Sequence, residues 1–296
     1  MSESSADSHF RILAADKLAP EGLDFVRSQS DAEVDSKVGL SEDELCEIIG
    51  EYDGMIVRSG VKVTEKMLAN SGKLRVIARA GVGVDNIDLN AATKQGIVVL
   101  NTAEANTVST AEHAFALLMA LARNIGPAYR TMVEGGWDRS NFVGEQLSGK
   151  TLGIVGFGRI GHTIAERALV FGMDVVAYDP FINAETAMDG QVKLFSDFEK
   201  MLPHADAMTF HVPLNDQTRG MLNAQTFPKC RDGVLVVNAA RGGVIDEDDL
   251  IGAIDSGKCG GAALDVYTNE PPPQDSPLRK HPKVLLTPHL GASTRQ

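Results

Sequence analysis

The sequence predicts an α/β protein with two domains built on parallel sheets, and three observations support this. Short apolar runs typical of buried strands alternate along the chain with segments of helical periodicity. The length of 296 residues suits two ordinary domains better than one large domain. One stretch, residues 151–179, combines a strand, a glycine turn, a helix and a second strand. We therefore expect a larger domain organised around that stretch and a smaller α/β domain.

The turn in TLGIVGFGRIGHTIAERALVFGMDVVAYD has the spacing G-x-G-x-x-G, formed by Gly156, Gly158 and Gly161. This spacing allows a tight turn at Gly156, close approach of a pyrophosphate at Gly158, and close packing of helix on strand at Gly161. The helix N-terminus adds unpaired N–H groups and a positive dipole, and Gly172 is placed to end the helix. The stretch predicts dinucleotide binding.

The second strand of this stretch ends at Asp179, 18 positions after Gly161. A carboxylate there accepts hydrogen bonds from the adenosine ribose hydroxyls and repels a 2′-phosphate, so we expect NAD as the cofactor in preference to NADP. Glycine triplets also occur in turns for backbone reasons alone. Here strand, helix, second strand and terminal carboxylate agree, which favours the cofactor site.

Composition narrows the class of protein. Hydrophobic and charged contents of 43% and 23% are typical of globular proteins, and a formal net charge of -12 argues against nucleic-acid binding. The N-terminus lacks a signal-peptide pattern and no apolar stretch is long enough to span a bilayer, so we expect a cytoplasmic protein that does not bind membranes. Three separated cysteines predict inert thiols, without a disulfide framework or metal site. Residues 1–8 are expected to be a disordered tail.

The first domain is expected to be a flavodoxin-like parallel α/β domain over residues 9–103. Its pattern alternates strands with helices, and Ser41 with Glu44 indicates a capping box before one helix. The expected strands are Phe10–Ala14, Gly54–Val57, Leu74–Ala78 and Ile97–Leu100, and the expected helices are Leu23–Gln29 and Glu42–Ile49.

Arginines follow two of these strands. Arg58 comes directly after Val57 and Arg79 directly after Ala78. Ligands of open α/β sheets bind at the carboxyl edge of the strands, so this pair, with Lys62 nearby, is suited to an anion. Surface charge explains the arginines equally well. Both interpretations stay open on the sequence alone.

The second domain is expected over residues 104–290 as a doubly wound, Rossmann-type fold inserted into the first domain, to which residues 291–296 would return. Its first helix, in TVSTAEHAFALLMALARNI, shows a possible capping box at Ser109 and Glu112. Because this helix is apolar nearly all round, its own domain or a second subunit must cover it. Four strands join the two of the glycine stretch to make six: Ala207–Phe210, Val234–Asn238, Ala262–Asp265 and Val284–Leu286.

Three polar side chains follow strands of this second domain. Arg241, Glu270 and His289 are expected to converge at the sheet edge where NAD lies. A histidine there accepts a hydroxyl proton as hydride leaves, a carboxylate holds its ring, and an arginine binds a substrate carboxylate. A structural histidine and a loop carboxylate are the alternative. His211 also follows a strand and is placed to line the cofactor site, whereas His113 shows no such companions.

The motifs GFGRIG with AYDP, NAARGG, DVYTNEP and TPHLGAS occur in this order, and the chain resembles the D-isomer-specific 2-hydroxyacid dehydrogenase family over nearly its whole length. The resemblance implies catalytic roles for Arg241, Glu270 and His289. It also implies a position near the nicotinamide for Asp265. Further cofactor contacts implied by the resemblance are at Gly156, Gly158, Arg159, Ile160, Gly161, Asp179, His211 and Ala240.

Within the family, VRSGVKVT, RAGVGVDNID, ANTVSTAEH and GGWDRSNFVG are similar to members that act on a phosphorylated 2-hydroxy acid. This implies substrate contacts from Arg58, Arg79 and Asn106, and contact of Arg139 with the phosphate in a neighbouring subunit of a homodimer or larger oligomer. Val82 departs from the threonine that relatives often have. Members of the family continue, after the position that matches Gln296, with a helix that returns to the first domain. We therefore expect domain closure to be impaired in a chain that ends at Gln296.

Two other functions fit the same motifs. One is reduction of glyoxylate or hydroxypyruvate by a member of the same family, although Asp179 argues against its NADPH-preferring members. The other is an NAD-sensing binding protein similar to the corepressors that keep this architecture. Turnover of a phosphorylated substrate separates the first function from the reductase, and cofactor binding without turnover favours the binding protein.

Overall fold

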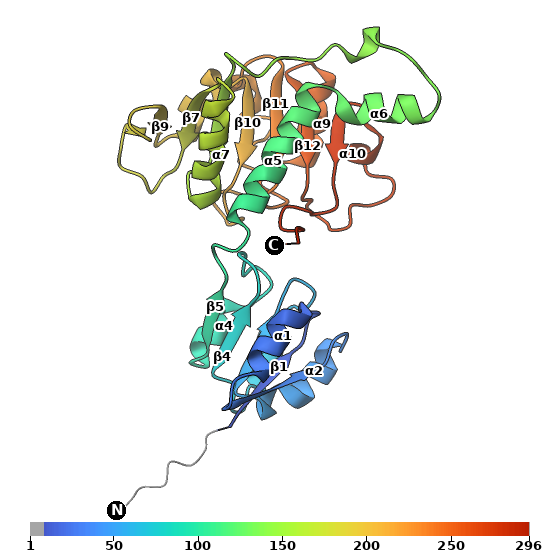
Figure 1. Cartoon of the computed structure of the whole chain (residues 1–296). Coiled ribbons are helices and arrows are strands. Elements are labelled where there is room, and N and C mark those ends of the chain that lie inside the picture. Colours follow the sequence, from blue (N-terminus) through green and yellow to red (C-terminus); the bar gives the residue numbers. More distant parts are fainter. Residues whose placement is uncertain (1–8, 296) are drawn as a thin grey trace, which may run out of the picture. The chain divides into compact units, whose positions relative to one another are not determined.

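The computed structural model describes residues 9–295, which form two compact units divided between Ala105 and Asn106 (Figure 1). The expected tail, residues 1–8, lies outside the described residues. Residues 291–295 group with the second unit, which corrects the expected return to the first domain. The cause is local bonding: the N–H of Gly291 donates to Asp265, and the hydroxyl of Thr110 donates to the Gly291 carbonyl.

The first unit is a five-stranded parallel sheet in the order β2-β1-β3-β4-β5, which confirms the flavodoxin-like prediction. The edge strand β2 was not predicted, because two of its five residues are acidic and its apolar pattern is weak. The elements are β1 (Phe10–Ala14), α1 (Pro20–Arg27), β2 (Ala32–Ser36), α2 (Glu42–Ile48), β3 (Gly54–Val57), α3 (Glu65–Ala69), β4 (Val76–Arg79), α4 (Leu89–Lys94) and β5 (Val98–Asn101).

The core of the first unit packs strand residues against the helices that connect them. Leu13, Met55 and Ile77 of the sheet are fully buried and belong to one cluster with Met67 and Leu68 of α3. The capping box at α2 is confirmed, because Ser41 and Glu44 each satisfy the other's backbone N–H. The same cluster contains Val57, after which Arg58 follows, and Ile77, two residues before Arg79 at the end of β4.

The second unit contains, among the described residues, an eight-stranded sheet in the order β13-β12-β11-β10-β6-β7-β9-β8. The order confirms the doubly wound prediction, and the two strands that sequence reasoning missed, β9 and the two-residue antiparallel β8, extend one edge. The strands are β6 (Thr151–Val155), β7 (Asp174–Tyr178), β8 (Thr186–Ala187), β9 (Val192–Phe195), β10 (Ala207–Phe210), β11 (Val234–Asn238), β12 (Cys259–Leu264) and β13 (Val284–Leu286).

Helices cover both faces of this sheet (Figure 1). One apolar cluster joins the sheet to α5 and α7, and a second joins it to α8, α9 and α10. The helices are α5 (Thr107–Ala122), α6 (Ile125–Val133), α7 (Arg159–Val170), α8 (Phe198–Met201), α9 (Glu247–Asp255) and α10 (Pro277–Lys280). The strand order reverses between β6 and β10, which leaves a crevice position at their carboxyl ends.

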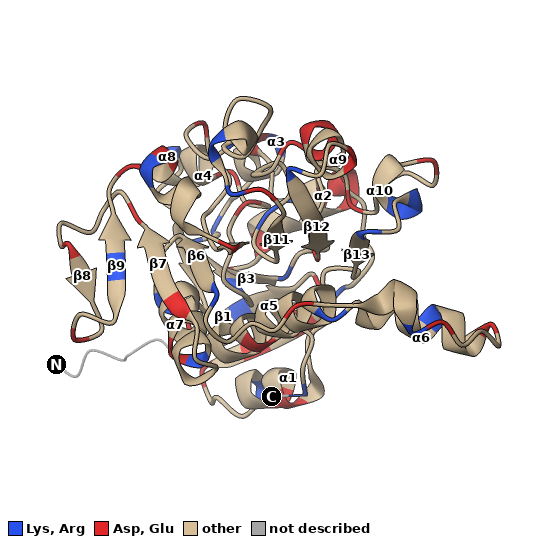
Figure 2. Ribbon diagram, turned by 90° about the horizontal axis from the view of Figure 1, so that it is seen from above, with Lys and Arg blue, Asp and Glu red and all other residues tan. Residues whose placement is uncertain are grey.

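Helix α5 differs from its prediction in the position of its cap, and its own unit, one of the two covers expected, packs against its apolar face. It begins at Thr107 after the N-cap residue Asn106, so Ser109 is not a cap; the Ser109 hydroxyl donates instead to the Asn106 carbonyl. Its apolar face is covered by its own unit, since Ala111, Ala114 and five further residues are buried. Exposed apolar side chains gather further along the chain, on α6 and the residues after it. Helix α6 extends away from the sheet (Figure 2).

No helix within residues 9–295 has the length and apolar character needed to cross a bilayer.

Two of the three cysteines are buried against the second unit's sheet. Burial raises the pKa of Cys230 to about 11 and that of Cys259 to about 12. Both thiols are therefore protonated at neutral pH and covered, whereas Cys46 on α2 is only half-buried.

We expect a thiol reagent at about pH 8 to modify Cys46 in the native chain and to leave Cys230 and Cys259 unmodified, because thiolate and access are both required for reaction. Mass spectrometry of labelled peptides measures this. Denaturant serves as the control and should expose all three thiols. Fast labelling of Cys230 or Cys259 without denaturant would contradict the buried positions.

Candidate active site

The glycine turn joins β6 to α7 at the point where the strand order reverses. Gly156 has φ of +94°, and a Cβ there would lie 2.7 Å from the carbonyl oxygen of His211. A Cβ on Gly161 would overlap the Gly156 carbonyl oxygen, so both residues must be glycine for steric reasons. At Gly158, by contrast, a Cβ would meet nothing within 4 Å. The open side of Gly158 at the N-terminus of α7 therefore fits the approach of a pyrophosphate.

Asp179 follows β7 and lies against the glycine turn. One carboxylate oxygen accepts the N–H of Phe157 at 3.0 Å, and the other accepts the N–H of Phe181 at 2.9 Å. Arg159 and Ile160 are the first two residues of α7. The carboxylate thus holds the turn in place, and its remaining lone pairs fit the ribose hydroxyls of a dinucleotide.

His211 lies directly after β10, behind the glycine turn. Its Nε2 is 2.8 Å from the Thr209 hydroxyl, while its buried Nδ1 has no hydrogen-bond partner in the part of the chain described. Burial lowers the pKa of His211 to about 3, so the ring is neutral at physiological pH. An unpaired buried nitrogen at this edge is a group that a bound ligand can satisfy.

We expect acid to destabilise the wild-type chain more than a His211→Gln variant. Between the unfolded pKa of about 6.5 and the folded pKa of about 3, only the unfolded state binds this proton. The free energy of unfolding then falls with decreasing pH by up to about 1.4 kcal/mol per pH unit. Urea unfolding at about pH 7 and about pH 5 measures the difference, roughly 2 kcal/mol. Equal losses in both proteins would contradict a buried neutral ring.

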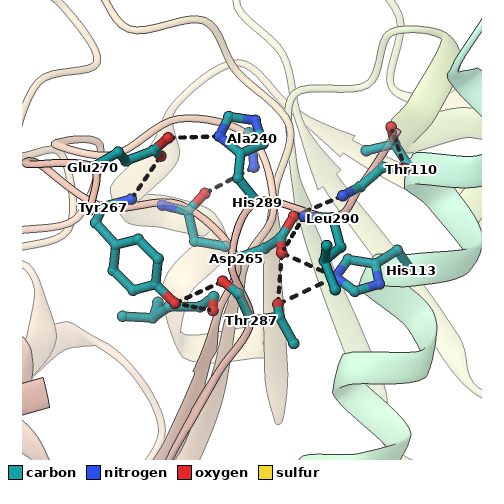
Figure 3. A network of polar contacts seen from close by, with 12 residues as sticks. Thr110, His113, Ala240, Asp265, Tyr267, Glu270, Thr287, His289 and Leu290 are labelled. Atoms are coloured by element: carbon teal, nitrogen blue, oxygen red, sulfur yellow. Dashed lines mark hydrogen bonds and ion pairs between the residues drawn. The ribbon is translucent and has the colours of Figure 1, made fainter. Parts of the chain in front are cut away.

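His289 and Glu270 form a hydrogen-bonded pair at the carboxyl edge of the second sheet (Figure 3). Nδ1 of His289 is 2.7 Å from one Glu270 carboxylate oxygen, and the other oxygen accepts the N–H of Tyr267 at 3.1 Å. Since Nδ1 donates to the carboxylate, Nε2 is left with a lone pair that can accept a proton. The His289 backbone adopts φ of +55°, a left-handed conformation that costs energy outside glycine and often occurs at functional sites.

The segment that carries His289 is tied to the buried carboxylate of Asp265 (Figure 3). Asp265 follows β12 and accepts hydrogen bonds from the Thr287 hydroxyl at 2.6 Å and from the N–H groups of Leu290 and Gly291 at 2.8 and 2.9 Å. His113 of α5 lies 3.1 Å from the same carboxylate. The carboxylate is completely buried and therefore fixes the residues on both sides of His289.

The role of His113 corrects the sequence analysis, which found no companions for it. Its Nε2 is also 3.3 Å from the Thr287 hydroxyl, so α5 reaches the end of β13 through this ring. The available signal was its place three residues after the buried Thr110 and four before the buried Leu117. Tyr267 was also missed: its hydroxyl lies 2.8 Å from the Thr287 carbonyl.

Arg241 lies in the loop after β11, beside the loop that carries Glu270. A Cβ on the next residue, Gly242, would overlap the Tyr267 carbonyl, so the two loops are in backbone contact. The Asn238 side chain accepts the N–H of Ala240 and donates to the Arg241 carbonyl at 2.9 Å, which fixes the turn. The expected catalytic residues thus come from three adjacent strand ends of one sheet.

The four expected substrate residues are divided between the units. In the first unit, Arg58 follows β3 and Arg79 is the last residue of the neighbouring β4, since Val57 pairs with Arg79 in the β3–β4 register. In the second unit, Asn106 precedes α5, and its buried side-chain oxygen has no partner in the described chain, while Arg139 lies in an exposed segment after α6.

One protein-family model matches most of the second unit. The family model "D-isomer specific 2-hydroxyacid dehydrogenase, NAD binding domain" matches residues 115–291. The chain belongs to the D-isomer-specific 2-hydroxyacid dehydrogenase family. The matched segment contains the glycine turn, Asp179 and the His289–Glu270 pair, so the second unit carries the NAD-binding domain of this family.

Several curated relatives are named D-3-phosphoglycerate dehydrogenase. The protein from Archaeoglobus fulgidus is 47% identical over 97% of this chain and 54% of its own length, and that from Bacillus subtilis is 46% identical over 97% and 54%. This chain therefore spans about half the length of the curated relatives it matches. Among solved structures, the TT0316 protein of Thermus thermophilus is 34% identical over 96% of this chain and 91% of its own, with a TM-score of 0.86.

A second solved structure shows the same fold with ligands. D-lactate dehydrogenase from Aquifex aeolicus, in complex with NAD and lactic acid, is 27% identical over 96% of this chain and 90% of its own, with a TM-score of 0.82. The likeness extends over both units of this chain.

Proposed function

We propose that this chain is an NAD-dependent dehydrogenase that oxidises D-3-phosphoglycerate to 3-phosphohydroxypyruvate, the first step of the phosphorylated route to serine. The observation that carries the proposal is the His289–Glu270 pair, at 2.7 Å, on the same sheet edge as the glycine turn. The names of the curated relatives support the substrate. NAD, when bound, supplies the acceptor for the hydride that leaves the substrate carbon.

The side chains of the second unit have distinct roles in this reaction. Nε2 of His289 accepts the hydroxyl proton, and returns it when the reaction runs towards reduction. Glu270 fixes the ring through Nδ1 and offsets the positive charge that the ring gains. Arg241 binds the substrate carboxylate and polarises the forming carbonyl. Gly158, Asp179 and His211 hold the cofactor, with Arg159, Ile160, Ala240 and Asp265 as further expected contacts.

The substrate phosphate is assigned to arginines other than Arg241. Arg58 and Arg79 supply two cations at neighbouring strand ends, which suits a doubly charged phosphate better than a small acid whose only charge is its carboxylate. Asn106 completes the substrate contacts, and Arg139 is assigned to the substrate of a second subunit. Without these contacts the same chemistry serves glyoxylate or hydroxypyruvate, and a solved glyoxylate reductase from Paecilomyes thermophila is 29% identical, with a TM-score of 0.86.

We expect His289→Gln to lower kcat by about 10²- to 10⁴-fold, because the proton acceptor is lost while the fold remains. NADH oxidation with phosphohydroxypyruvate and with hydroxypyruvate, followed by absorbance, measures this. His281→Gln is a matched control, since His281 also pairs with a carboxylate, that of Asp255 at 3.2 Å, but precedes β13 instead of following it.

The outcomes separate the candidate functions. Turnover that prefers the phosphorylated acid, and that is lost in His289→Gln and kept in His281→Gln, supports the proposal. Preference for hydroxypyruvate favours the reductase. Tight NADH binding without any turnover favours the binding protein, and equal activity of His289→Gln and wild type rules out the assigned proton acceptor.

We also propose that the chain forms a homodimer through the surface of α6 and the residues after it. This surface exposes large apolar side chains, which a single copy leaves in water: Ile125, Tyr129, Met132, Val133 and Trp137. A second copy that covers them also brings Arg139 to a neighbouring subunit, as the substrate assignment requires.

We expect light scattering to give twice the chain mass of 31.6 kDa, and a Tyr129→Glu, Val133→Glu double variant to give the single mass, because buried unpaired charge opposes association. Phe25→Glu, on the exposed face of α1, controls for surface charge in general. A monomeric wild type, or a double variant that stays dimeric, contradicts the assignment of this surface.

A further inference from the structure

The loop after β3, residues 58–61, is held in place from two sides by side chains that come from other parts of the first unit. Arg58, Ser59 and Gly60 are exposed, and the loop ends at the buried Val61. If Arg58 binds the substrate phosphate, as the proposed function states, the geometry of this loop sets where that cation lies.

Asp16 binds the loop from the side of β1. A single carboxylate oxygen accepts the N–H of Arg58 at 2.7 Å and the N–H of Val61 at 3.1 Å. Asp16 is itself fixed, since it is 9% exposed and the preceding residue, Ala15, donates its N–H to the Ile56 carbonyl of β3. The carboxylate therefore sets the spacing between the first and last residues of the loop.

Asn86 binds the same two residues from the other side. Its side-chain N–H groups donate to the carbonyls of Arg58 and Val61, each at 2.7 Å. The Asn86 backbone is anchored in turn, because its carbonyl accepts the N–H of Val63 at 2.8 Å. Together the two side chains satisfy both the N–H and the C=O of Arg58 and of Val61.

Asp16 and Asn86 hold the first and last residues of the loop, whereas Ser59 and Gly60 between them are exposed. Gly60 packs so closely on Asp16 that an added Cβ would overlap the carboxylate. The Arg58 guanidinium donates to the carbonyl of Lys17, the residue after Asp16, at 3.2 Å. The segment that fixes the loop backbone thus also orients the charged end of Arg58.

We propose that Asp16 and Asn86 are positioning residues for anion binding, which hold the Arg58–Val61 loop in the conformation that receives the substrate phosphate. This inference rests on the proposed function. At Asp16, an effect of charge and an effect of position predict opposite changes in phosphate binding. Its negative charge repels a nearby phosphate, so a purely electrostatic role predicts tighter binding when Asp16 is replaced by any neutral residue. A positioning role predicts weaker binding whenever the acceptor is lost.

The experiment uses three variants of the full chain at Asp16 and Asn86 and one matched control. Asp16→Ala removes the acceptor, Asp16→Asn removes the charge and keeps an oxygen acceptor, and Asn86→Ala removes the donors. Asp53→Ala is the control, because Asp53 accepts the N–H of Arg11 at 3.0 Å near the start of β1, at the opposite edge of the same sheet.

We expect Asp16→Ala and Asn86→Ala each to raise the KM for phosphohydroxypyruvate and the Kd of 3-phosphoglycerate, measured by calorimetry, by about tenfold. The value of kcat and the Kd of NADH should stay within about twofold, because the proton acceptor and the glycine turn lie in the second unit. Asp16→Asn and Asp53→Ala should bind as wild type does, or Asp16→Asn slightly tighter. Amide exchange at Arg58 and Val61 should accelerate only in Asp16→Ala.

The remaining outcomes overturn the inference or the proposed function separately. Tighter binding in Asp16→Ala, or an Asp16→Ala that matches Asp53→Ala in KM, Kd and amide exchange, overturns the positioning role. A wild type that binds 3-phosphoglycerate without turnover overturns the reaction and leaves the positioning role to the calorimetric comparison. A wild type that binds no 3-phosphoglycerate overturns both.

Discussion

The arrangement of the candidate active site depends on one buried carboxylate, that of Asp265. A charge without solvent is costly unless donors surround it, and each hydrogen bond to a charged group contributes about 1.5–3 kcal/mol. Here the donors are a hydroxyl and two backbone N–H groups on the segment that carries His289, with His113 opposite. The hydrogen bonds that satisfy Asp265 therefore also fix the backbone on both sides of His289. The left-handed backbone at His289 is held by these neighbours.

The parallel sheets explain why the remaining groups gather where they do. Strands that run in one direction present all their carboxyl ends at one edge, and each unit places its polar side chains there. In the second unit this edge holds the glycine turn, Asp179, His211 and the His289–Glu270 pair. In the first unit it holds the loops that begin at Arg58 and Arg79. Backbone N–H groups and a few charged side chains at these edges can receive an anion without a basic surface, although the chain as a whole is acidic.

The features that were predicted correctly are those that short stretches of the sequence determine. Buried strands such as Val234–Asn238 and the glycine turn were predicted correctly, because apolar runs and backbone sterics leave short-range signals. The edge strand β2 was missed because edge strands tolerate polar residues. The strand β9 was missed because it has only four residues, one of them the exposed Lys193, so its apolar signal is short. The cap of α5 was misplaced because Asn106 and Ser109 are both polar residues near a helix start.

Contacts between residues that are far apart in the sequence could not be predicted from short patterns. His113 and Asp265 are 152 positions apart, and nothing in either neighbourhood predicts that they meet. The hydrogen bonds that join Asp16 and Asn86 to Arg58 are of the same kind, since these residues follow three different strands. Such pairs appear only once the topology has placed the strand ends side by side.

The close packing of Gly60 on Asp16 links the amino-acid choices at the two positions. Any side chain at position 60 displaces the carboxylate, even though the backbone there needs no left-handed conformation. Conversely, a smaller residue at position 16 leaves room for a side chain at position 60 but gives up the two backbone N–H groups that the carboxylate holds. In related chains the two positions should therefore vary together, and a designer who changes one must redesign the other.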